Sequence, residues 1–135
     1  MSKELAINQA IDNQLNSILR HMTDTLGKPG VFPNGLENNQ LQNLLGVTRE
    51  TGSVEVVKNY IRYQIGRQKN TWGYTGPDKV IFGERLISDL DWLHDLAQTI
   101  AADIDGASLD VDSIWMRLTQ LYLGNLNRYF RYAKP

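Results

Sequence analysis

The chain has 135 residues, with 14 Lys and Arg against 15 Asp and Glu and a formal net charge of −1. This length is typical of one domain, and 41% hydrophobic residues suffice for a core without cross-links. The absence of cysteine excludes disulfide scaffolds, thiolate zinc sites, cysteine nucleophiles and iron–sulfur clusters. The balanced charge offers no overall argument for a nucleic-acid partner. No signal sequence or membrane-spanning apolar run is visible, so we expect a cytoplasmic protein without a membrane contact.

Apolar residues at spacings of three and four predict a first helix whose buried stripe runs from Leu5 to Leu26. Gly and Pro residues over 27–35 end it. A shorter helix is expected over residues 37–50. The turn that follows contains Ser53, which can cap a third helix that begins at Val54 and ends near Arg67.

Residues 68–79 are rich in Gly, Asn and Thr and are expected to form a loop, which Trp72 and Tyr74 anchor to the body. A fourth helix over residues 80–103 and a fifth from residue 111 nearly to the C-terminus follow. No stretch alternates with a period of two residues, so strands are not expected. The sequence therefore predicts an all-α fold, a compact bundle of about five amphipathic helices in a single domain over residues 1–135.

The charges are unevenly distributed along the chain. Residues 49–69 carry a net charge of +3, residues 84–112 carry −7, and residues 113–135 carry +4. The near-neutral total therefore hides separate basic and acidic segments.

Helix geometry groups the basic side chains of the last segment into a stripe. At about 100° per residue, Arg117, Arg128 and Arg131 fall within a sector of about 60° opposite the apolar face. Gly124 lies in the same sector, where a missing side chain lets a phosphate approach closely. Two neutral donors border this sector, Gln120 and Asn127.

A second basic group lies on the third helix, where Lys58, Arg62 and Lys69 share one side. Arg67 faces two tyrosines of the same helix, and its guanidinium can lie over an aromatic ring. Such stripes suit a nucleic-acid backbone, because guanidinium groups match phosphate and release its counterions. Two other interpretations remain open: a helix face that is charged for solvation, and a surface for an acidic protein partner.

The acid-rich segment over residues 84–112 also allows two interpretations. An acidic face on one copy and a basic face on another would favour head-to-tail association, which builds rings or filaments. Neutralisation by cations of the same molecule is the simpler explanation.

No group of residues assembles into an active site. Asp91, His94 and Asp95 share a helix face at a spacing that can gather a metal, but no further ligand is identifiable. His21 borders an apolar stripe and is not expected to act as a base. We therefore expect neither an enzyme nor a bound metal or cofactor, and a metal enzyme built on the Asp91 group is the least favoured hypothesis.

Three short segments occur in an order typical of a known family. They are Asn39–Leu45 (NQLQNLL), Tyr60–Arg67 (YIRYQIGR) and Leu126–Ala133 (LNRYFRYA). Together they resemble the small subunit of type III CRISPR effector complexes, which shows an SQLRN-like helix start, a YQ-x-GR-like helix end and a last helix with an aromatic–Ala–Tyr tail. The resemblance covers residues 36–135. Two features depart from the family: Gln42 stands where the family has an arginine, and the C-terminal tail matches that of the family only in part.

The resemblance implies a non-catalytic, all-helical subunit. Members of that family stack in several copies along a filament of guide RNA and target RNA, beside a large nuclease–cyclase subunit, and contact RNA backbone through Arg and Lys. By position, Arg62, Arg67 and Arg128 fall on or beside the matching motifs. Face geometry adds five further cations: Lys58, Lys69, Arg117, Arg131 and Lys134.

The sequence thus predicts an RNA-contacting subunit of a CRISPR ribonucleoprotein. Its expected partners are the guide and target RNA backbone, other effector subunits and, by head-to-tail stacking, copies of itself. The alternative is a helical protein-interaction module, an adaptor or regulator without nucleic-acid contact. That module would use an apolar patch around Trp72, Tyr74 and Phe130.

Overall fold

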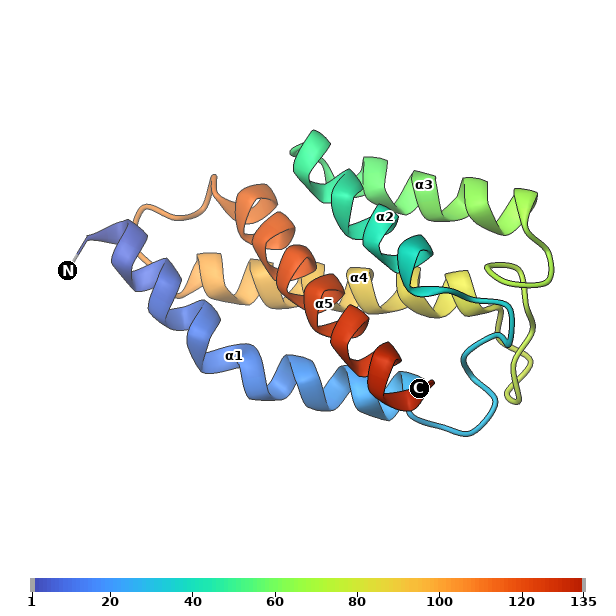
Figure 1. Cartoon of the computed structure of the whole chain (residues 1–135). Helices are drawn as coiled ribbons and strands as arrows, with labels where there is room; N and C mark the ends of the chain where they lie inside the picture. Colours follow the sequence, from blue (N-terminus) through green and yellow to red (C-terminus); the bar gives the residue numbers. More distant parts are fainter. Residues whose placement is uncertain (1, 135) are drawn as a thin grey trace.

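The computed structural model describes residues 2–134 and shows five α-helices (Figure 1). They are α1 (Lys3–Leu26), α2 (Asn38–Glu50), α3 (Val54–Arg67), α4 (Phe82–Ala102) and α5 (Val111–Ala133). Within residues 2–134 there is no strand, and the only extended pairing is an isolated bridge between Thr75 and Ile81. The predicted all-α bundle is confirmed. None of the helices in this part of the chain is long and apolar enough to cross a membrane.

Local signals set most helix ends. Ser53 caps α3 as predicted, since its hydroxyl accepts a hydrogen bond from the Val56 amide at 3.3 Å. The fourth helix begins at Phe82, two residues later than predicted, because the preceding loop folds back on it. The Phe82 and Gly83 amides donate to the carbonyls of Tyr74 and Trp72, at 2.8 and 2.9 Å. The loop carbonyls thereby satisfy amides at the start of α4, where no side chain caps the helix.

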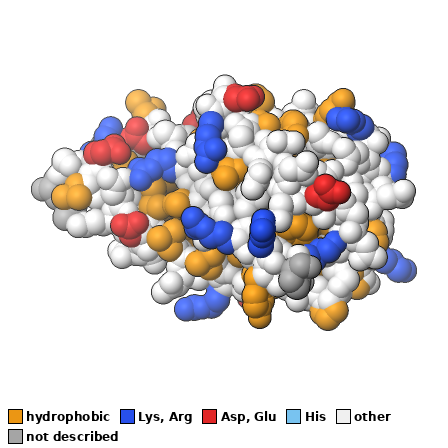
Figure 2. Space-filling model, in the orientation of Figure 1, with side chains coloured by type: hydrophobic (Ala, Val, Ile, Leu, Met, Phe, Trp, Pro, Cys, Tyr) orange, Lys and Arg blue, Asp and Glu red, His pale blue; other side chains and the backbone are white. Residues whose placement is uncertain are grey.

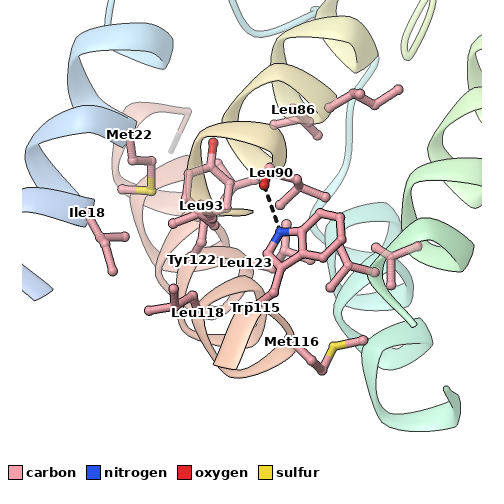
Figure 3. Packing of buried hydrophobic residues seen from close by; sticks show 14 of the residues in the cluster. Ile18, Met22, Leu86, Leu90, Leu93, Trp115, Met116, Leu118, Tyr122 and Leu123 are labelled. Carbon is pink, nitrogen blue, oxygen red and sulfur yellow. Dashed lines mark hydrogen bonds between the residues drawn. The ribbon is translucent and has the colours of Figure 1, made fainter. Parts of the chain in front are cut away.

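The helices α4 and α5 cross at the centre of the molecule, with α1 on one side and α2 and α3 on the other (Figure 1). Leucines and aromatic rings of α4 and α5 fill the space between them (Figure 3). The indole nitrogen of Trp115 on α5 donates to the Leu90 carbonyl of α4 at 2.8 Å. This bond satisfies a polar atom inside an otherwise apolar core.

The loop after α3 is anchored by Trp72, as predicted, because its side chain is 1% exposed and packs against Phe82. Phe130 is also buried and meets Phe32 edge-on at 5.1 Å. Tyr74 is half-buried. The predicted apolar patch of Trp72, Tyr74 and Phe130 is therefore not a surface patch, because two of its three rings lie in the core.

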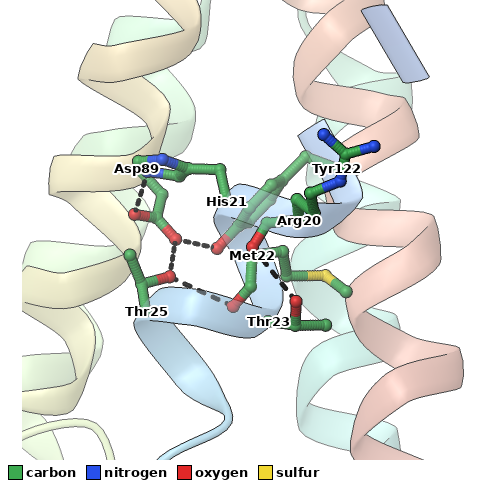
Figure 4. Close-up of polar contacts among 7 residues, drawn as sticks. All are labelled: Arg20, His21, Met22, Thr23, Thr25, Asp89 and Tyr122. Carbon is green, nitrogen blue, oxygen red and sulfur yellow. Dashed lines mark hydrogen bonds and ion pairs between the residues drawn. The ribbon is translucent and has the colours of Figure 1, made fainter. Parts of the chain in front are cut away.

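A cluster of polar side chains ties α1 to α4 and α5 around the buried carboxylate of Asp89 (Figure 4). Tyr122 donates a hydrogen bond to this carboxylate, and Thr25 donates another at 2.8 Å. The Nε2 atom of His21 lies 3.1 Å from the second carboxylate oxygen, and the His21 ring stacks on Trp92 at 3.8 Å between centroids. His21 is thus a packing residue of α1.

Burial dominates the titration of this cluster. It raises the pKa of Asp89 above its ordinary value, although the hydrogen bonds from Tyr122 and Thr25 and the nearby His21 oppose the rise. Burial and the charge of Asp89 together raise the pKa of Tyr122 well above its ordinary value.

Candidate nucleic-acid interface

Six exposed cations without an acidic partner lie on α2, on α3 with the loop after it, and on α5. They are Arg49, Arg62, Arg67, Lys69, Arg128 and Arg131, none of which takes part in an ion pair among residues 2–134. Two more exposed and unpaired cations lie elsewhere, Arg20 on α1 and Lys79 in the loop before α4. Their positive charge is therefore available to a partner.

The helices α2 and α5 run antiparallel and are joined by two amide side chains of α5. Gln120 donates to the Thr48 carbonyl at 3.1 Å, and Asn127 to the Leu41 carbonyl at 3.5 Å. The two bonds are seven residues apart on each helix, which is about 10 Å along the axis. These amides, predicted to border the basic stripe as neutral donors, hold α2 against α5.

Between these helices lies a furrow that we call the α2–α5 groove. It contains two adjoining hollows, and Arg128 lines both. The first hollow, of about 350 Å³, is lined by Asn38, Gln42, Asn127, Arg128 and Arg131. The second hollow, of about 330 Å³, is lined by Leu45, Arg49, Gln120, Leu121, Gly124, Asn125 and Arg128.

Gly124 opens the second hollow, because no atom lies within 4 Å of the position that a Cβ would take there. Arg128 is held between the hollows by Asn125, whose side-chain oxygen accepts a hydrogen bond from it at 3.4 Å. Figure 2 shows a row of Lys and Arg side chains across the middle of the face on which α5 lies, with few acidic side chains between them. The groove thus combines fixed positive charge with space.

A second basic surface surrounds the end of α3. The Arg67 guanidinium lies 5.9 Å from the ring centroid of Tyr63, as predicted. Arg62 is exposed, and Lys69 lines a separate hollow of about 530 Å³ between the loops that precede α2 and follow α3.

Lys58 does not belong to this surface, although the sequence predicted it there. Its side chain is 9% exposed and its ammonium lies 2.6 Å from Asp91 and 3.3 Å from Glu55. The ammonium also lies 5.8 Å from the ring centroid of Trp115. Burial lowers the pKa of Lys58, but the hydrogen bonds and charges of Asp91 and Glu55 outweigh it and raise the pKa overall. Lys58 thus joins α3 to α4, and its ammonium is already paired and not free to bind RNA.

Arg117 and Lys134 are also engaged within the protein. Arg117 donates to the Asn8 side-chain oxygen at 2.6 Å and lies 3.7 Å from the Glu4 carboxylate, so it faces α1. The Lys134 ammonium donates to the carbonyls of Pro33 and Asn34, both at 2.8 Å. Both side chains therefore make tertiary contacts within the fold, unlike the arginines of the groove, and their predicted contacts with RNA stay predictions.

The acidic segment divides in a similar way. Asp89 is buried, Asp91 binds Lys58, and Asp110 pairs with Lys3 at 3.0 Å. Its other acidic side chains are exposed and have no ion-pair partner among residues 2–134: Glu84, Asp95, Asp103, Asp105 and Asp112. Neutralisation within the molecule thus accounts for part of the segment only.

The Asp91 group does not form a ligand set in the structure. The Asp91 carboxylate is taken by Lys58, and the His94 ring lies edge-on to Trp115 at 4.4 Å. Over residues 2–134, no three His, Asp or Glu side chains are placed to hold a metal ion.

Sequence reasoning missed Arg49 and the amides of Asn38 and Gln42 as members of the basic surface. Each faces the groove from α2, and no periodicity within α5 could reveal a neighbour from another helix. A signal for Arg49 was present in the net charge of residues 49–69.

No protein-family model matches the chain, and no curated protein or solved structure matches it either.

Proposed function

We propose that this protein is a non-catalytic small subunit of a type III CRISPR effector complex, in which it binds the backbone of guide or target RNA. One observation carries the proposal: Arg49, Arg128 and Arg131 are exposed around the α2–α5 groove and have no acidic partner among residues 2–134. Guanidinium groups bind phosphate in a bidentate manner, and each phosphate contact releases counterions.

The positions of the resembling segments support this proposal. Asn39–Leu45 lies on α2, and Leu126–Ala133 forms the last part of α5. The first hollow is bounded by both segments, through Gln42 from one and Arg128 and Arg131 from the other. Two motifs that are far apart in the sequence thus border one basic groove.

The protein-interaction alternative receives less support. It relied on an apolar patch, and the side chains of Trp72 and Phe130 are 1% and 3% exposed. The exposed large apolar residues, such as Leu5, Val56 and Leu109, come from separate elements. Apolar residues scattered in this way are ordinary on a protein surface.

The test is the binding of a fluorescein-labelled single-stranded RNA, measured by fluorescence anisotropy with the wild type and with the R128E/R131E variant. Three phosphate contacts predict that raising the salt from about 50 to about 200 mM weakens wild-type binding about 20-fold. We expect R128E/R131E to bind at least about tenfold more weakly, because two attractive contacts become repulsive.

The matched control reverses the charge of Arg20, which is exposed on α1 and has no ion-pair partner among residues 2–134. We expect R20E to bind RNA as the wild type does. Equal binding by the wild type and R128E/R131E, or no binding by the wild type, would overturn the proposal.

A further inference from the structure

The two hollows of the α2–α5 groove are spaced too widely for stacked bases. The α5 residues of the second hollow centre on Gly124 and those of the first on residues 127–131, which is a separation of about 7 Å along the helix. Stacked bases of one strand lie about 3.4 Å apart. Two consecutive bases that occupied these hollows would therefore be unstacked from each other.

Arg128 stands between the hollows. Its guanidinium is planar and always charged, so a base on either side can lie against it, as bases do on Arg and aromatic side chains in single-strand binding proteins. In the structure its guanidinium donates to the Asn125 side-chain oxygen at 3.4 Å. Arg131 at one end and Arg49 at the other leave positive charge beside each hollow for the phosphates.

The first hollow also offers groups that pair with base edges. Asn38 and Gln42 carry amides, each of which can both donate and accept hydrogen bonds. The Asn127 side-chain oxygen also lacks a hydrogen bond from residues 2–134, but it is buried, so the amides of Asn38 and Gln42 are the groups that can meet a base.

From this arrangement we infer that the α2–α5 groove seats two unpaired nucleobases, one on each side of Arg128, so that its ligand is a single strand and not a duplex. The inference rests on the proposed function. It adds that the nucleic acid is single-stranded and that the groove contacts its bases. A protein that contacts only the backbone would need the arginines, but neither of the two hollows.

The experiment compares three probes with the wild-type full chain: a labelled single strand of about 12 nucleotides, the same strand in a duplex, and the same strand with four consecutive bases removed. We expect the intact single strand to bind at least tenfold more tightly than the duplex, and at least fivefold more tightly than the strand without bases. Equal affinities for the intact and base-free strands would overturn the inference while leaving the proposed function in place.

Variants that fill the groove provide a second test. Gly124→Leu places a side chain in the second hollow, and Gly52→Leu makes the same change in the turn between α2 and α3, where a Cβ also meets no atom within 4 Å. We expect G124L to weaken single-strand binding at least fivefold and G52L to change it less than twofold, with circular dichroism to verify folding. Wild-type affinity in G124L would contradict the inference, whereas wild-type protein that binds no RNA would remove the proposed function itself.

Discussion

Asp89 shows how a charged side chain can be held inside the core of this protein. Its carboxylate is buried, and its oxygens are satisfied by Tyr122, Thr25 and His21 from two other helices. Removal from water disfavours the charged form, and the raised pKa of Asp89 indicates that this cost exceeds the gain from the hydrogen bonds. Folding therefore favours proton uptake at this position.

A pH-dependent stability follows from the raised pKa of Asp89. Its contribution to stability is fully present below the unfolded-state pKa and is lost as the pH rises through the higher pKa of the folded state. Urea unfolding of the wild type and of D89N, measured from neutral to mildly acidic pH, should show the difference in free energy of unfolding shifting in favour of the wild type as the pH falls. A constant difference would show that Asp89 has the same pKa in both states.

Close packing between helices depends on particular small residues. A Cβ at Gly83, in the first turn of α4, would lie 2.5 Å from the Ile65 Cγ1 atom and 3.1 Å from the Trp72 carbonyl. The absence of a side chain thus lets α4 approach α3 and the loop after it. Gly46 on α2 is different, because a Cβ there meets no atom within 4 Å.

These two glycines give opposite predictions for replacement by alanine. G83A should lower the free energy of unfolding by about 1–3 kcal/mol, because the added methyl group overpacks the contact of α3 with α4. G46A should raise it by about 0.5–1 kcal/mol, since alanine is favoured over glycine within a helix. Urea denaturation monitored by circular dichroism measures both. Equal effects would mean that helix propensity alone acts at these positions.

Some exposed charges of opposite sign lie at opposite ends of the molecule. The turn between α4 and α5 carries Asp103 and Asp105, and it lies at the end opposite the C-terminus of α3, where Arg67 and Lys69 are found (Figure 1). Unlike ends on one molecule allow head-to-tail contacts between copies, and such contacts do not close into a dimer. This distribution is consistent with the head-to-tail stacking that the family resemblance implies.

Self-association is therefore expected at low salt. Sedimentation velocity of the wild type should show a sedimentation coefficient that rises with protein concentration at about 50 mM salt and falls back as salt screens the charges. The D103K/D105K variant should remain monomeric. D12K, which reverses an exposed acid of α1, should associate as the wild type does. Association by D103K/D105K to the wild-type extent would exclude a contact through this turn.

Much of the fold was predictable from the sequence. The bounds of α3 and the start of α5 agree with the prediction, since caps such as Ser53 act within a single turn. The apolar stripes predicted burial less reliably at the ends of the helices. Leu5, on the predicted stripe of α1, is 48% exposed, whereas Ile7 and Ile11 on the same helix are buried.

The candidate site was predictable only in part. Arg128 and Arg131 lie on one exposed side of α5, as the helical periodicity indicated. Arg117 shares that side by angle, yet it binds Asn8, which is 109 residues away in the chain. Lys58 likewise binds Asp91 of another helix. The angle of a residue on its helix indicates its direction, but not the group that it meets.

The pattern of the chain was enough to establish five helices, their approximate ends and the separation of basic from acidic segments, because these depend on neighbours within a few residues. Which cations stay free depended on the packing of the helices. An ammonium or guanidinium group that meets a carboxylate or carbonyl from a distant element is neutralised or satisfied there, as Lys134 is by the carbonyls of Pro33 and Asn34. Only where α2 and α5 pack together without an acid between them do Arg49, Arg128 and Arg131 form one basic groove.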